Sequence, residues 1–554
     1  MPTHRAERSA PAEKKAAQQH LLIAALRRTS YLALACVVAV ATGCTSLPGK
    51  NYPRQPTPQP VHAPSPQLTS ATLQSPPPSA GRSGFRLYST GIDGLLLRLE
   101  LIRTAQRSLD LQYYIFHGDE SGRLITEALL AAARRGVRVR ILVDDGETEK
   151  GDEEVFALAS EPSVAIRVFN PWHYRGHNVV LRSTEFLFGK SRLDHRMHNK
   201  LFIADGAVAL VGGRNIGDQY FQVDPGSQYA DDDVLVTGKV MEALNSAFEE
   251  YWLSQRSVPV EAFVPAKQRD AQALERLAAR HTAPQKAASS GSDFVAKLQT
   301  DEPLADVLSG SAQLSWAAAE LSCDSPDKTE PDVSRRVASL MFAPVARAIR
   351  ETKSQLIMVT PYLIPAQSEL RMLQEVDSNG RRVRVLTTSL EATTDPAAQA
   401  GYNHFRIPLL RAGVDLYELR RQPEHSRGTG QSRSMIRHGN FGLHAKLLVF
   451  DRSAVYVGSM NYDARSRWIN TEIGLIIHSP ELATEVDTRF AQMTEPGNSY
   501  HVTLVDKGPK GDPQLHWSTV RDGKAVEYLR EPAHSGWQRL QVRVLSLLPI
   551  DNEL

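Results

Sequence analysis

Apolar and polar positions along the chain follow two periods, and the order in which these periods occur is repeated. A period of about 3.6 residues indicates an amphipathic helix, and a short apolar run indicates a buried strand. The first stretch predicts a helix at 91–107, a strand at 109–115, a helix at 122–135 and a strand at 137–143. The second predicts a helix at 342–353, a strand at 356–360, a helix at 367–376 and a strand at 382–386. Strands alternating with helices predict an α/β fold of two similar lobes, each a mixed, largely parallel sheet flanked by helices.

The repeat can be followed residue by residue. The segment from Gly136 to Leu142 aligns with the segment from Gly380 to Leu386 without a gap, at an offset of 380 − 136 = 244 positions. Self-similarity of this kind indicates that one structural unit occurs twice. We assign the first lobe to residues 85–260 and the second lobe to residues 333–496.

Two segments fall outside the repeat. Residues 261–332 are rich in alanine and charged residues and predict a helical connector between the lobes. Residues 497–554 contain alternating strand-like runs and predict a β-rich extension. Within this extension we expect Trp517 and Trp537 to be packing residues.

The N-terminus has the pattern of an export signal. Arg27 and Arg28 precede an apolar run, and small residues then lead to Cys44. The run is too short for a membrane-spanning helix, which needs roughly 20 residues. We interpret residues 1–43 as a signal peptide of lipoprotein type and Cys44 as a lipidated residue, with an ordinary secretory signal or an uncleaved anchor as the alternatives.

The following segment, residues 44–84, is rich in proline and small polar residues, which predicts a disordered tether. Together these features predict a protein of the bacterial cell envelope that is held by a lipid anchor. The residue after Cys44 is Thr45 rather than aspartate, which favours the outer membrane and a position facing the periplasm.

The overall charge depends on whether the signal is counted. The whole chain has 64 basic and 62 acidic residues, a net charge of +2. Residues 1–43 hold 6 basic and 2 acidic residues, so the remainder has 58 − 60 = −2. A non-specific nucleic-acid binder is expected to be basic, so we expect no nucleic-acid partner. Of the three cysteines, Cys36 lies in the signal and Cys44 is the lipidation site, which leaves Cys323 without a disulfide partner.

One spacing of polar residues occurs twice, His-x-Lys-x4-Asp-x6-Gly-Gly/Ser-x-Asn. The first copy contains His198, Lys200, Asp205, Gly212, Gly213 and Asn215; the second contains His444, Lys446, Asp451, Gly458, Ser459 and Asn461. Residues two apart in a strand point to the same face, so each histidine projects together with its lysine. The aspartates, counted with the catalytic set, fall where a tight turn begins and are expected to hold it. The small pair and the asparagine are expected to let backbone amides approach a phosphate group.

Two histidine–lysine pairs suit two-step phosphoryl transfer. One imidazole attacks phosphorus, the other protonates the leaving oxygen, and the lysines neutralise the non-bridging oxygens. An attacking histidine needs an acceptor on its other ring nitrogen, and the candidates are Glu472 for one lobe and an aspartate of 231–233 for the other. A lysine beside each histidine repels a cation, so we expect neither a metal nor a cofactor.

These motifs resemble the HKD motifs of the phospholipase D superfamily, over nearly all of residues 85–496. Within that superfamily the chain is most similar to the bacterial cardiolipin synthase C type. The segments that carry the finer resemblance are 192–200, 212–218, 463–466, 470–472 and 547–550.

The resemblance implies two lobes that face each other across a pseudo-two-fold axis, with one active site at their interface. It implies that His198 is the nucleophile and His444 the acid and base, with Glu472 and Asp233 orienting them. The implied reaction forms cardiolipin from phosphatidylglycerol and a second phospholipid through a phosphohistidine intermediate. A hydrolytic phospholipase D, a secreted nuclease and a non-enzymatic scaffold are the alternatives, and the repeat alone leaves the roles of the two histidines exchangeable.

The segment at 170–193, directly before the first motif, interleaves aromatic, apolar and basic residues. Such a composition suits a lipid headgroup with nearby acyl chains, and it also suits nucleotide stacking or a partly packed loop. The expected membrane tether favours a lipid.

Overall fold

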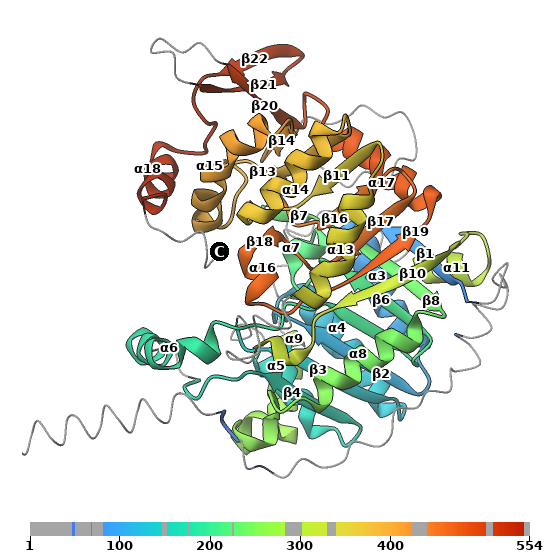
Figure 1. Ribbon diagram of the computed structural model, residues 1–554. Helices are drawn as coiled ribbons and strands as arrows, with labels where there is room; N and C mark the ends of the chain where they lie inside the picture. Colours follow the sequence, from blue (N-terminus) through green and yellow to red (C-terminus); the bar gives the residue numbers. More distant parts are fainter. Residues whose placement is uncertain are drawn as a thin grey trace, which may run out of the picture.

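The computed structural model describes residues 47–49, 52, 68, 81–146, 152–175, 178–223, 226–282, 302–329, 339–423, 440–505 and 513–547. The expected signal peptide, Cys44 and nearly all of the tether lie outside these residues. Within the described ranges no helix is long and apolar enough to cross a membrane. The chain forms two lobes, with the first (blue to green) below the second (yellow to red) in Figure 1.

The first lobe is a mixed sheet. Its strands are, in spatial order, β1 (Ser83–Tyr88), β8 (Asp233–Gly238), β6 (Val208–Gly212), β5 (Leu201–Ala204), β2 (Ser108–Tyr113), β3 (Arg138–Asp144), β4 (Val164–Phe169) and β9 (Ser257–Pro259). Strands β2, β3 and β4 are parallel to one another, and the other neighbours pair antiparallel.

The second lobe repeats this order. Its strands are β10 (Ser315–Cys323), β19 (Ile473–His478), β17 (Ala454–Gly458), β16 (Leu447–Phe450), β11 (Gln355–Val359), β13 (Arg382–Thr388), β14 (Asp415–Leu419) and β20 (Ser499–Val505). Again only the central three, β11, β13 and β14, are parallel among the described strands of this sheet. The two mixed α/β lobes are confirmed, but antiparallel pairing outweighs the largely parallel pairing we expected, because each motif contributes a hairpin rather than a crossover.

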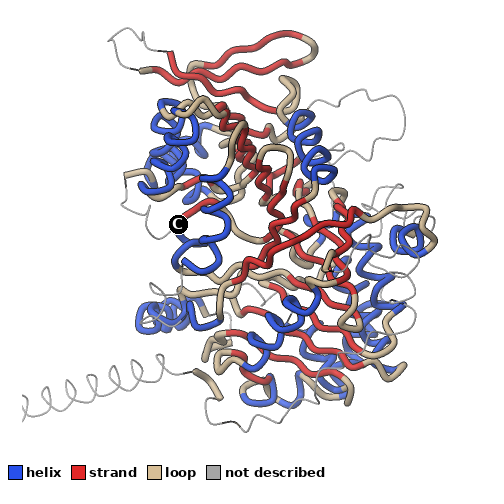
Figure 2. Tube along the Cα trace, turned by 45° about the vertical axis from the view of Figure 1, so that its right-hand side comes forward, coloured by secondary structure: helices blue, strands red, loops and turns tan. Residues whose placement is uncertain are grey.

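Helices cover the outer faces of both sheets (Figures 1 and 2). The first lobe has α3 (Gly91–Thr104), α4 (Glu120–Arg134), α5 (Asp152–Ala157), α6 (Val179–Leu193), α7 (Asp218–Phe221) and α8 (Met241–Leu253). The second has α13 (Ser339–Glu351), α14 (Gln367–Ser378), α15 (Pro396–Arg411), α16 (Ala464–Trp468), α17 (Pro480–Met493) and α18 (Gly536–Leu545). Helix α4 shows why these segments are helical, because the Asp119 side chain accepts a hydrogen bond from the Gly122 N–H at its start and Ile125 and Leu129 are buried on one face.

A shared apolar layer joins the lobes. The inner faces of the two sheets contribute to one buried cluster, which includes Leu201 and Val211 of the first lobe and Leu447 and Val457 of the second. Each lobe also has a buried apolar cluster of its own, which lies between its sheet and its outer helices. Since the strands that follow the two motif histidines both enter the shared layer, the histidines are held at the interface of the lobes.

The connector corrects one expectation. It contains the helices α9 (Ala271–Thr282) and α11 (Pro303–Leu308), but it also contains β10. The first part of β10 pairs with β1 at Ala317 and the second part pairs with β19 from Ala318 onward, so this strand links the two sheets. The expectation of a helical connector was therefore wrong for residues 315–323, because pairing at two sheet edges, rather than the local sequence pattern, makes this segment a strand.

The C-terminal extension is β-rich as expected, with β20, β21 (Gln514–Arg521) and β22 (Lys524–Tyr528) continuing the second sheet. Trp517 is buried and its indole N–H donates to Glu418. Trp537 lies on the terminal helix α18 and is 68% exposed, so its assignment as a packing residue was wrong.

Candidate active site at the lobe interface

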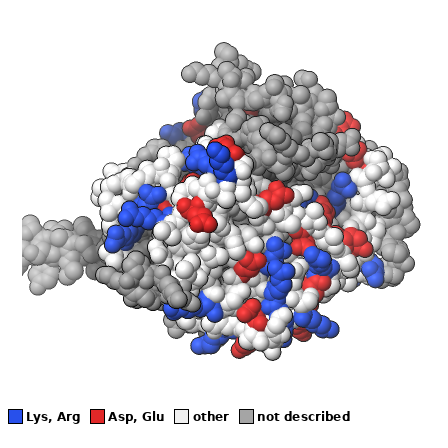
Figure 3. All heavy atoms as spheres, turned by 90° about the horizontal axis from the view of Figure 1, so that it is seen from above, with Lys and Arg blue, Asp and Glu red and all other residues white. Residues whose placement is uncertain are grey.

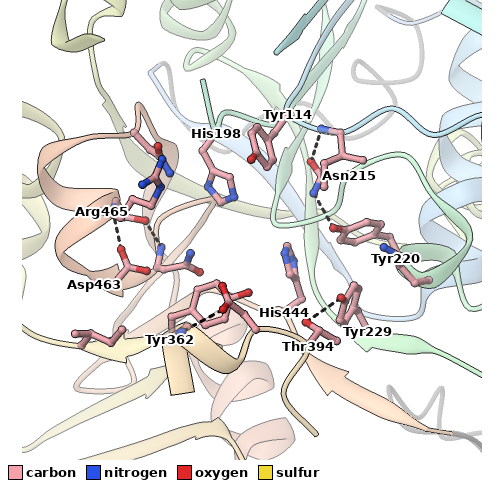
Figure 4. A pocket seen from close by; sticks show the side chains of 18 of the residues that line it. Tyr114, His198, Asn215, Tyr220, Tyr229, Tyr362, Thr394, His444, Asp463 and Arg465 are labelled. Atoms are coloured by element: carbon pink, nitrogen blue, oxygen red, sulfur yellow. Dashed lines mark hydrogen bonds between the residues drawn. The ribbon is translucent and has the colours of Figure 1, made fainter. Parts of the chain in front are cut away.

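The two motif histidines face one cavity at the lobe interface (Figure 4). Each is oriented by an acid of the other lobe. The Nδ1 atom of His198 lies 2.9 Å and 3.0 Å from the two carboxylate oxygens of Glu472. The Nδ1 atom of His444 lies 2.6 Å from Oδ2 of Asp231. Each imidazole therefore has Nδ1 engaged and Nε2 available to a substrate. Because each pair crosses the interface, the site is complete only when both lobes are in place.

Main-chain hydrogen bonds between the lobes position each histidine next to the acid of the other lobe. The N–H of His198 donates to the carbonyl of Thr471, and the N–H of His444 donates to the carbonyl of Ala230. Next to the second contact, β7 (Gln228–Ala230) and β15 (Phe441–Leu443) form a small parallel sheet across the interface. Each acidic partner directly follows one of these contacts, so its position relative to the histidine is set by main-chain hydrogen bonds.

Asp231, rather than the expected Asp233, orients His444. Strand register gives the reason: Gly212 is paired with Asp233, and its counterpart Gly458 is paired with Gly474. Two residues before these partners stand Asp231 and Glu472, which are therefore the equivalent positions. Asp233 is buried instead against the guanidinium groups of Arg98 and Arg214, at 2.8 Å and 3.2 Å.

The two lysines lie beside their histidines as the strand spacing predicts. The ammonium group of Lys200 donates to the carbonyl of His198, and that of Lys446 donates to the carbonyl of His444. Burial lowers the pKa of Lys200 well below its usual value, against the attraction of Glu472. Burial lowers the pKa of Lys446 to about 8, partly offset by Asp231. Two buried lysines beside the two histidines place positive charge where an anionic phosphodiester would bind.

Burial favours the neutral form of both imidazoles in the unliganded protein. Burial lowers the pKa of His198 to about 4, although Glu472 opposes the shift. Burial, with Lys446 and Lys200 nearby, lowers the pKa of His444 well below its usual value. A bound phosphodiester would add a negative charge beside both rings and raise these pKa values again, because an opposite charge favours the protonated form. The site can therefore supply one neutral and one protonated histidine once substrate is bound.

The two carboxylates differ in their surroundings. Burial would raise the pKa of Glu472, but His198, Lys200 and the hydroxyl of Ser459 outweigh it, so its pKa is lowered. Burial raises the pKa of Asp231 to about 6, although Lys446 opposes the shift. Glu472 therefore remains ionised over a wider range of pH than Asp231.

The motif aspartates do not reach the site. Asp205 accepts hydrogen bonds from the backbone N–H groups of Gln106, Arg107 and Ser108, at 3.0, 2.8 and 2.9 Å. Asp451 accepts from the N–H groups of 353, 354 and 355. Both adopt positive φ, 50° and 53°, at the turn of their hairpin. Counting them as catalytic was wrong; they hold the turn, as their position in the strand pattern indicated.

The small residues of the motif make room for the carboxylates rather than for a phosphate. A Cβ atom on Gly213 would lie 2.2 Å from a carboxylate oxygen of Asp231. The hydroxyl of Ser459 donates to Glu472. Their assignment to phosphate binding was therefore wrong, since both contact the orienting acids.

The two motif asparagines do line the cavity. The backbone N–H of Ile115 donates a hydrogen bond to the amide oxygen of Asn215, and the amide nitrogen of Asn215 donates one to the hydroxyl of Tyr220. The amide oxygen of Asn461 is buried and makes no hydrogen bond in the structure, so this residue keeps an unused polar group at the cavity wall.

Sequence reasoning missed the aromatic wall of this cavity, whose volume is about 440 Å³. Four tyrosines line it, Tyr114, Tyr220, Tyr229 and Tyr362 (Figure 4). The ring of Tyr114 stands edge-on to His198 at 5.2 Å between centroids, and that of Tyr220 stands edge-on to His444 at 5.1 Å. Arg465, also missed, lines the same cavity and pairs with Asp194. The available signal was that Tyr114 lies near the end of the expected strand at 109–115, at the edge where a site forms in an α/β sheet.

The segment at 170–193 is largely a helix, α6, with short irregular residues before it. Trp172 stacks on Phe186 of the helix, and Glu185 accepts hydrogen bonds from the N–H groups of His173 and Tyr174. Several of its apolar side chains are nevertheless exposed. The interpretation as a simple loop is therefore excluded for residues 179–193.

Comparison with known proteins gives a consistent result. A family model described as "Cardiolipin synthase, PLD-like domain" matches residues 99–252 and 345–494, one match in each lobe. Cardiolipin synthase C of Escherichia coli is 34% identical over 487 residues, covering 88% of this chain and 99% of that protein. Cardiolipin synthase 1 of Bacillus anthracis is 23% identical, covering 74% of this chain and 67% of that protein.

Solved structures are less similar. A phosphatidylserine synthase from Haemophilus influenzae has 13% sequence identity and a TM-score of 0.49, and the match covers 75% of this chain and 86% of that one.

Proposed function

The chain belongs to the cardiolipin synthase, PLD-like domain family, and we propose that it forms cardiolipin by transferring a phosphatidyl group to phosphatidylglycerol. It is an enzyme of the phospholipase D superfamily, of the phosphatidyltransferase type. The observation that carries the proposal is the pair of buried imidazoles, each tied by Nδ1 to an acid of the other lobe and open at Nε2. Phospholipid substrates follow from the family.

In the first half-reaction Nε2 of His198 attacks phosphorus of the donor lipid. A P–N bond forms, the P–O bond to the headgroup alcohol breaks, and protonated His444 gives its proton to the leaving oxygen. Lys200 and Lys446 neutralise the developing charge on the non-bridging oxygens. We assign the nucleophile to His198 because its partner, Glu472, has a lowered pKa and stays ionised, whereas the pKa of Asp231, the partner of His444, is raised. An ionised Glu472 stabilises the cationic ring of the phosphohistidine.

In the second half-reaction His444, now neutral, takes the proton of a hydroxyl on phosphatidylglycerol. That oxygen attacks phosphorus, the P–N bond breaks, and His198 is restored. Water in place of this hydroxyl would give phosphatidic acid. The cavity wall includes four tyrosines, which give a lipid alcohol apolar surface to bind as it competes with water for the intermediate.

Charge supports a lipid substrate over a polynucleotide. On the face shown in Figure 3, basic and acidic side chains of the described residues are intermixed rather than gathered into a basic track. Nucleic-acid binders concentrate positive charge on one face.

We further propose that the enzyme is held at the cell envelope by a lipid on Cys44, with the outer membrane favoured. The support is the sequence pattern of residues 1–44. Mass spectrometry of the native N-terminal peptide tests it, with acyl groups on Cys44 as the expected result. A Cys44→Ser variant that stays membrane-bound with unchanged migration would contradict it and favour an uncleaved anchor.

The function is tested with the full chain reconstituted in vesicles that contain labelled phosphatidylglycerol, with and without EDTA. We expect labelled cardiolipin and free glycerol, in equal amount with and without the chelator. Phosphatidic acid as the main product, even at high phosphatidylglycerol density, would identify a hydrolase. Loss of activity with EDTA would contradict metal independence, which stays a prediction.

A further inference from the structure

Helix α6 presents an apolar surface to solvent. Val179, Val180, Leu181 and Leu187 are exposed by 75%, 72%, 49% and 75%, and Phe188 by 39%. The helix projects from the body of the first lobe at the left of Figure 1. Its polar contacts lie on the opposite side: Glu185 is buried and accepts the N–H groups that precede the helix.

Helix α18, from the second lobe, shows the same character. Trp537, Leu540 and Val544 are exposed by 68%, 50% and 54%, and Leu547, just after the end of the helix, by 82%. Steps of three and four residues place them on one side of a helix. The opposite side already packs on α15, since Val542 is buried in a cluster with Leu390 and Ala400. The exposed apolar side chains of α18 are therefore not needed for the fold of the second lobe.

Each helix is joined to a wall of the catalytic cavity. Asp194, which ends α6, accepts two hydrogen bonds from Arg465, and Arg465 lines the cavity. On the other lobe, Asp395 and Pro396 at the start of α15 line the same cavity, and α15 carries α18. In Figure 1 both helices project on the same side of the molecule, with α16, which carries Arg465, between them.

The charge on both helices has one sign among the exposed residues. Lys190 on α6 and Arg539 and Arg543 on α18 are exposed, whereas the one acidic residue of α6, Glu185, is buried and α18 contains none. Apolar side chains beside lysine and arginine are the composition of a helix that lies in the headgroup region of an anionic bilayer. Basic residues near such a surface are attracted to its anionic headgroups.

We propose that α6 and α18 form a two-part membrane-docking surface that seats the cavity mouth on a bilayer containing anionic phospholipid. The surface draws one helix from each lobe, so a substrate leaving the bilayer meets both histidines. This inference rests on the proposed function for the identity of the substrate, but the contact of the helices with lipid is measured separately from turnover.

The contact is tested by fluorescence of the full chain in vesicles of phosphatidylglycerol carrying bromine on the acyl chains. We expect the bromine atoms to quench the fluorescence of Trp537. The Trp537→Phe variant should therefore lose a clear share of the quenching seen in the wild-type chain. In hydrogen exchange, peptides of α6 and α18 should be protected in vesicles relative to detergent. Quenching unchanged by Trp537→Phe, together with no protection of the two helices, would overturn the proposal.

The proposal would also be overturned if α6 and α18 were protected from hydrogen exchange without quenching by lipid while the molecular mass doubled. A second copy of the chain would then cover the two helices. Cross-linking of α18 to residues 1–80 would assign the surface to the chain's own N-terminal segment, with the same consequence.

Kinetics separate docking from catalysis. The variant Leu187→Gln/Leu540→Gln/Val544→Gln is compared with Leu253→Gln, at an exposed leucine that ends α8. For the triple variant, the ratio of turnover on vesicles to turnover on water-soluble short-chain phosphatidylglycerol should fall about tenfold or more, and for Leu253→Gln it should not change. An unchanged ratio in the triple variant would contradict docking. A wild-type chain that makes no cardiolipin from either substrate would instead refute the proposed function, whatever the quenching result.

Discussion

The two halves of the active site use the same motif but place it in different surroundings. His198 is tied to Glu472, whose pKa is lowered because His198, Lys200 and the hydroxyl of Ser459 outweigh the effect of burial. His444 is tied to Asp231, whose pKa burial raises to about 6. Duplication therefore supplied two imidazoles of similar geometry, and the residues around the acids made one half suited to a cationic intermediate and the other to exchange of a proton.

Removing either imidazole should have the largest effect. His198→Ala and His444→Ala should each reduce kcat by ~10³-fold or more, because each half-reaction needs both groups. Cardiolipin formation in vesicles is the measurement, with circular dichroism to show that the fold is kept. Activity within about tenfold of wild type in either variant, ~1.4 kcal/mol on the barrier, would refute the two-histidine mechanism.

The acids sharpen the comparison between the halves. Glu472→Gln should reduce kcat by about 100-fold and Asp231→Asn by about tenfold, within the range seen when a group that orients a catalytic residue is lost. Asp231 and then Glu472 raise the pKa of Lys446, so the alkaline limb of the pH profile should move to lower pH in both variants, and further in Asp231→Asn. Equal losses in both variants would remove the distinction between the two halves.

Asp233→Asn provides the matched control at the neighbouring carboxylate. It breaks a buried contact with Arg98 and Arg214 and should lower the free energy of unfolding by about 3 kcal/mol. Turnover per folded molecule should change less than in Asp231→Asn. Urea unfolding and single-turnover kinetics measure the two effects, and a larger catalytic loss at 233 than at 231 would restore the expectation from sequence.

The pH profile of kcat/KM tests the charge of the lysines. The neutral attacking imidazole of His198, with a pKa of about 4, should cause no acid loss until the pH approaches that value. Lys446, with a pKa of about 8, loses its proton above that pH, so kcat/KM should fall there. In Lys446→Arg the residual activity should lack this alkaline fall, whereas Lys239→Arg, at an exposed lysine, should keep it. A fall that persists in Lys446→Arg would assign it to another group.

The smallest effect is expected at the turn aspartates. Asp451→Ala removes the acceptor for three backbone N–H groups and should cost about 1–3 kcal/mol of unfolding free energy. Turnover of the folded protein should remain within about threefold, which chemical unfolding and initial rates can establish. A loss of turnover comparable to that of the histidine variants would return Asp451 to the catalytic set.

Local pattern predicted a large part of the site. Strand alternation placed Lys200 and Lys446 beside their histidines, because that relation depends on residues two apart. It also placed Asp205 and Asp451 at turns. The partner of each histidine could not be settled in this way: choosing among 231–233 depends on the pairing of β6 with β8 and on a contact between lobes.

The other missed features also depend on long-range contacts. Tyr229 and Arg465 reach the cavity only after the lobes have met. The strand β10 forms because two sheet edges are open to it, and its sequence alone shows weak alternation. The spacing of apolar residues in α18 could be recognised as an exposed face only after the structure showed which side of the helix packs on α15.

The central claim is that one histidine of this two-lobe site becomes covalently bonded to the donor lipid, and that it is His198. The direct measurement is rapid mixing of the full chain with phosphatidylglycerol vesicles, an alkaline denaturing quench and mass spectrometry of the peptides that contain residues 198 and 444. We expect the phosphatidyl group on His198, absent in His198→Ala. A phosphatidyl group on His444 would reverse the roles of the two halves, and turnover with no group on either histidine would contradict the covalent mechanism.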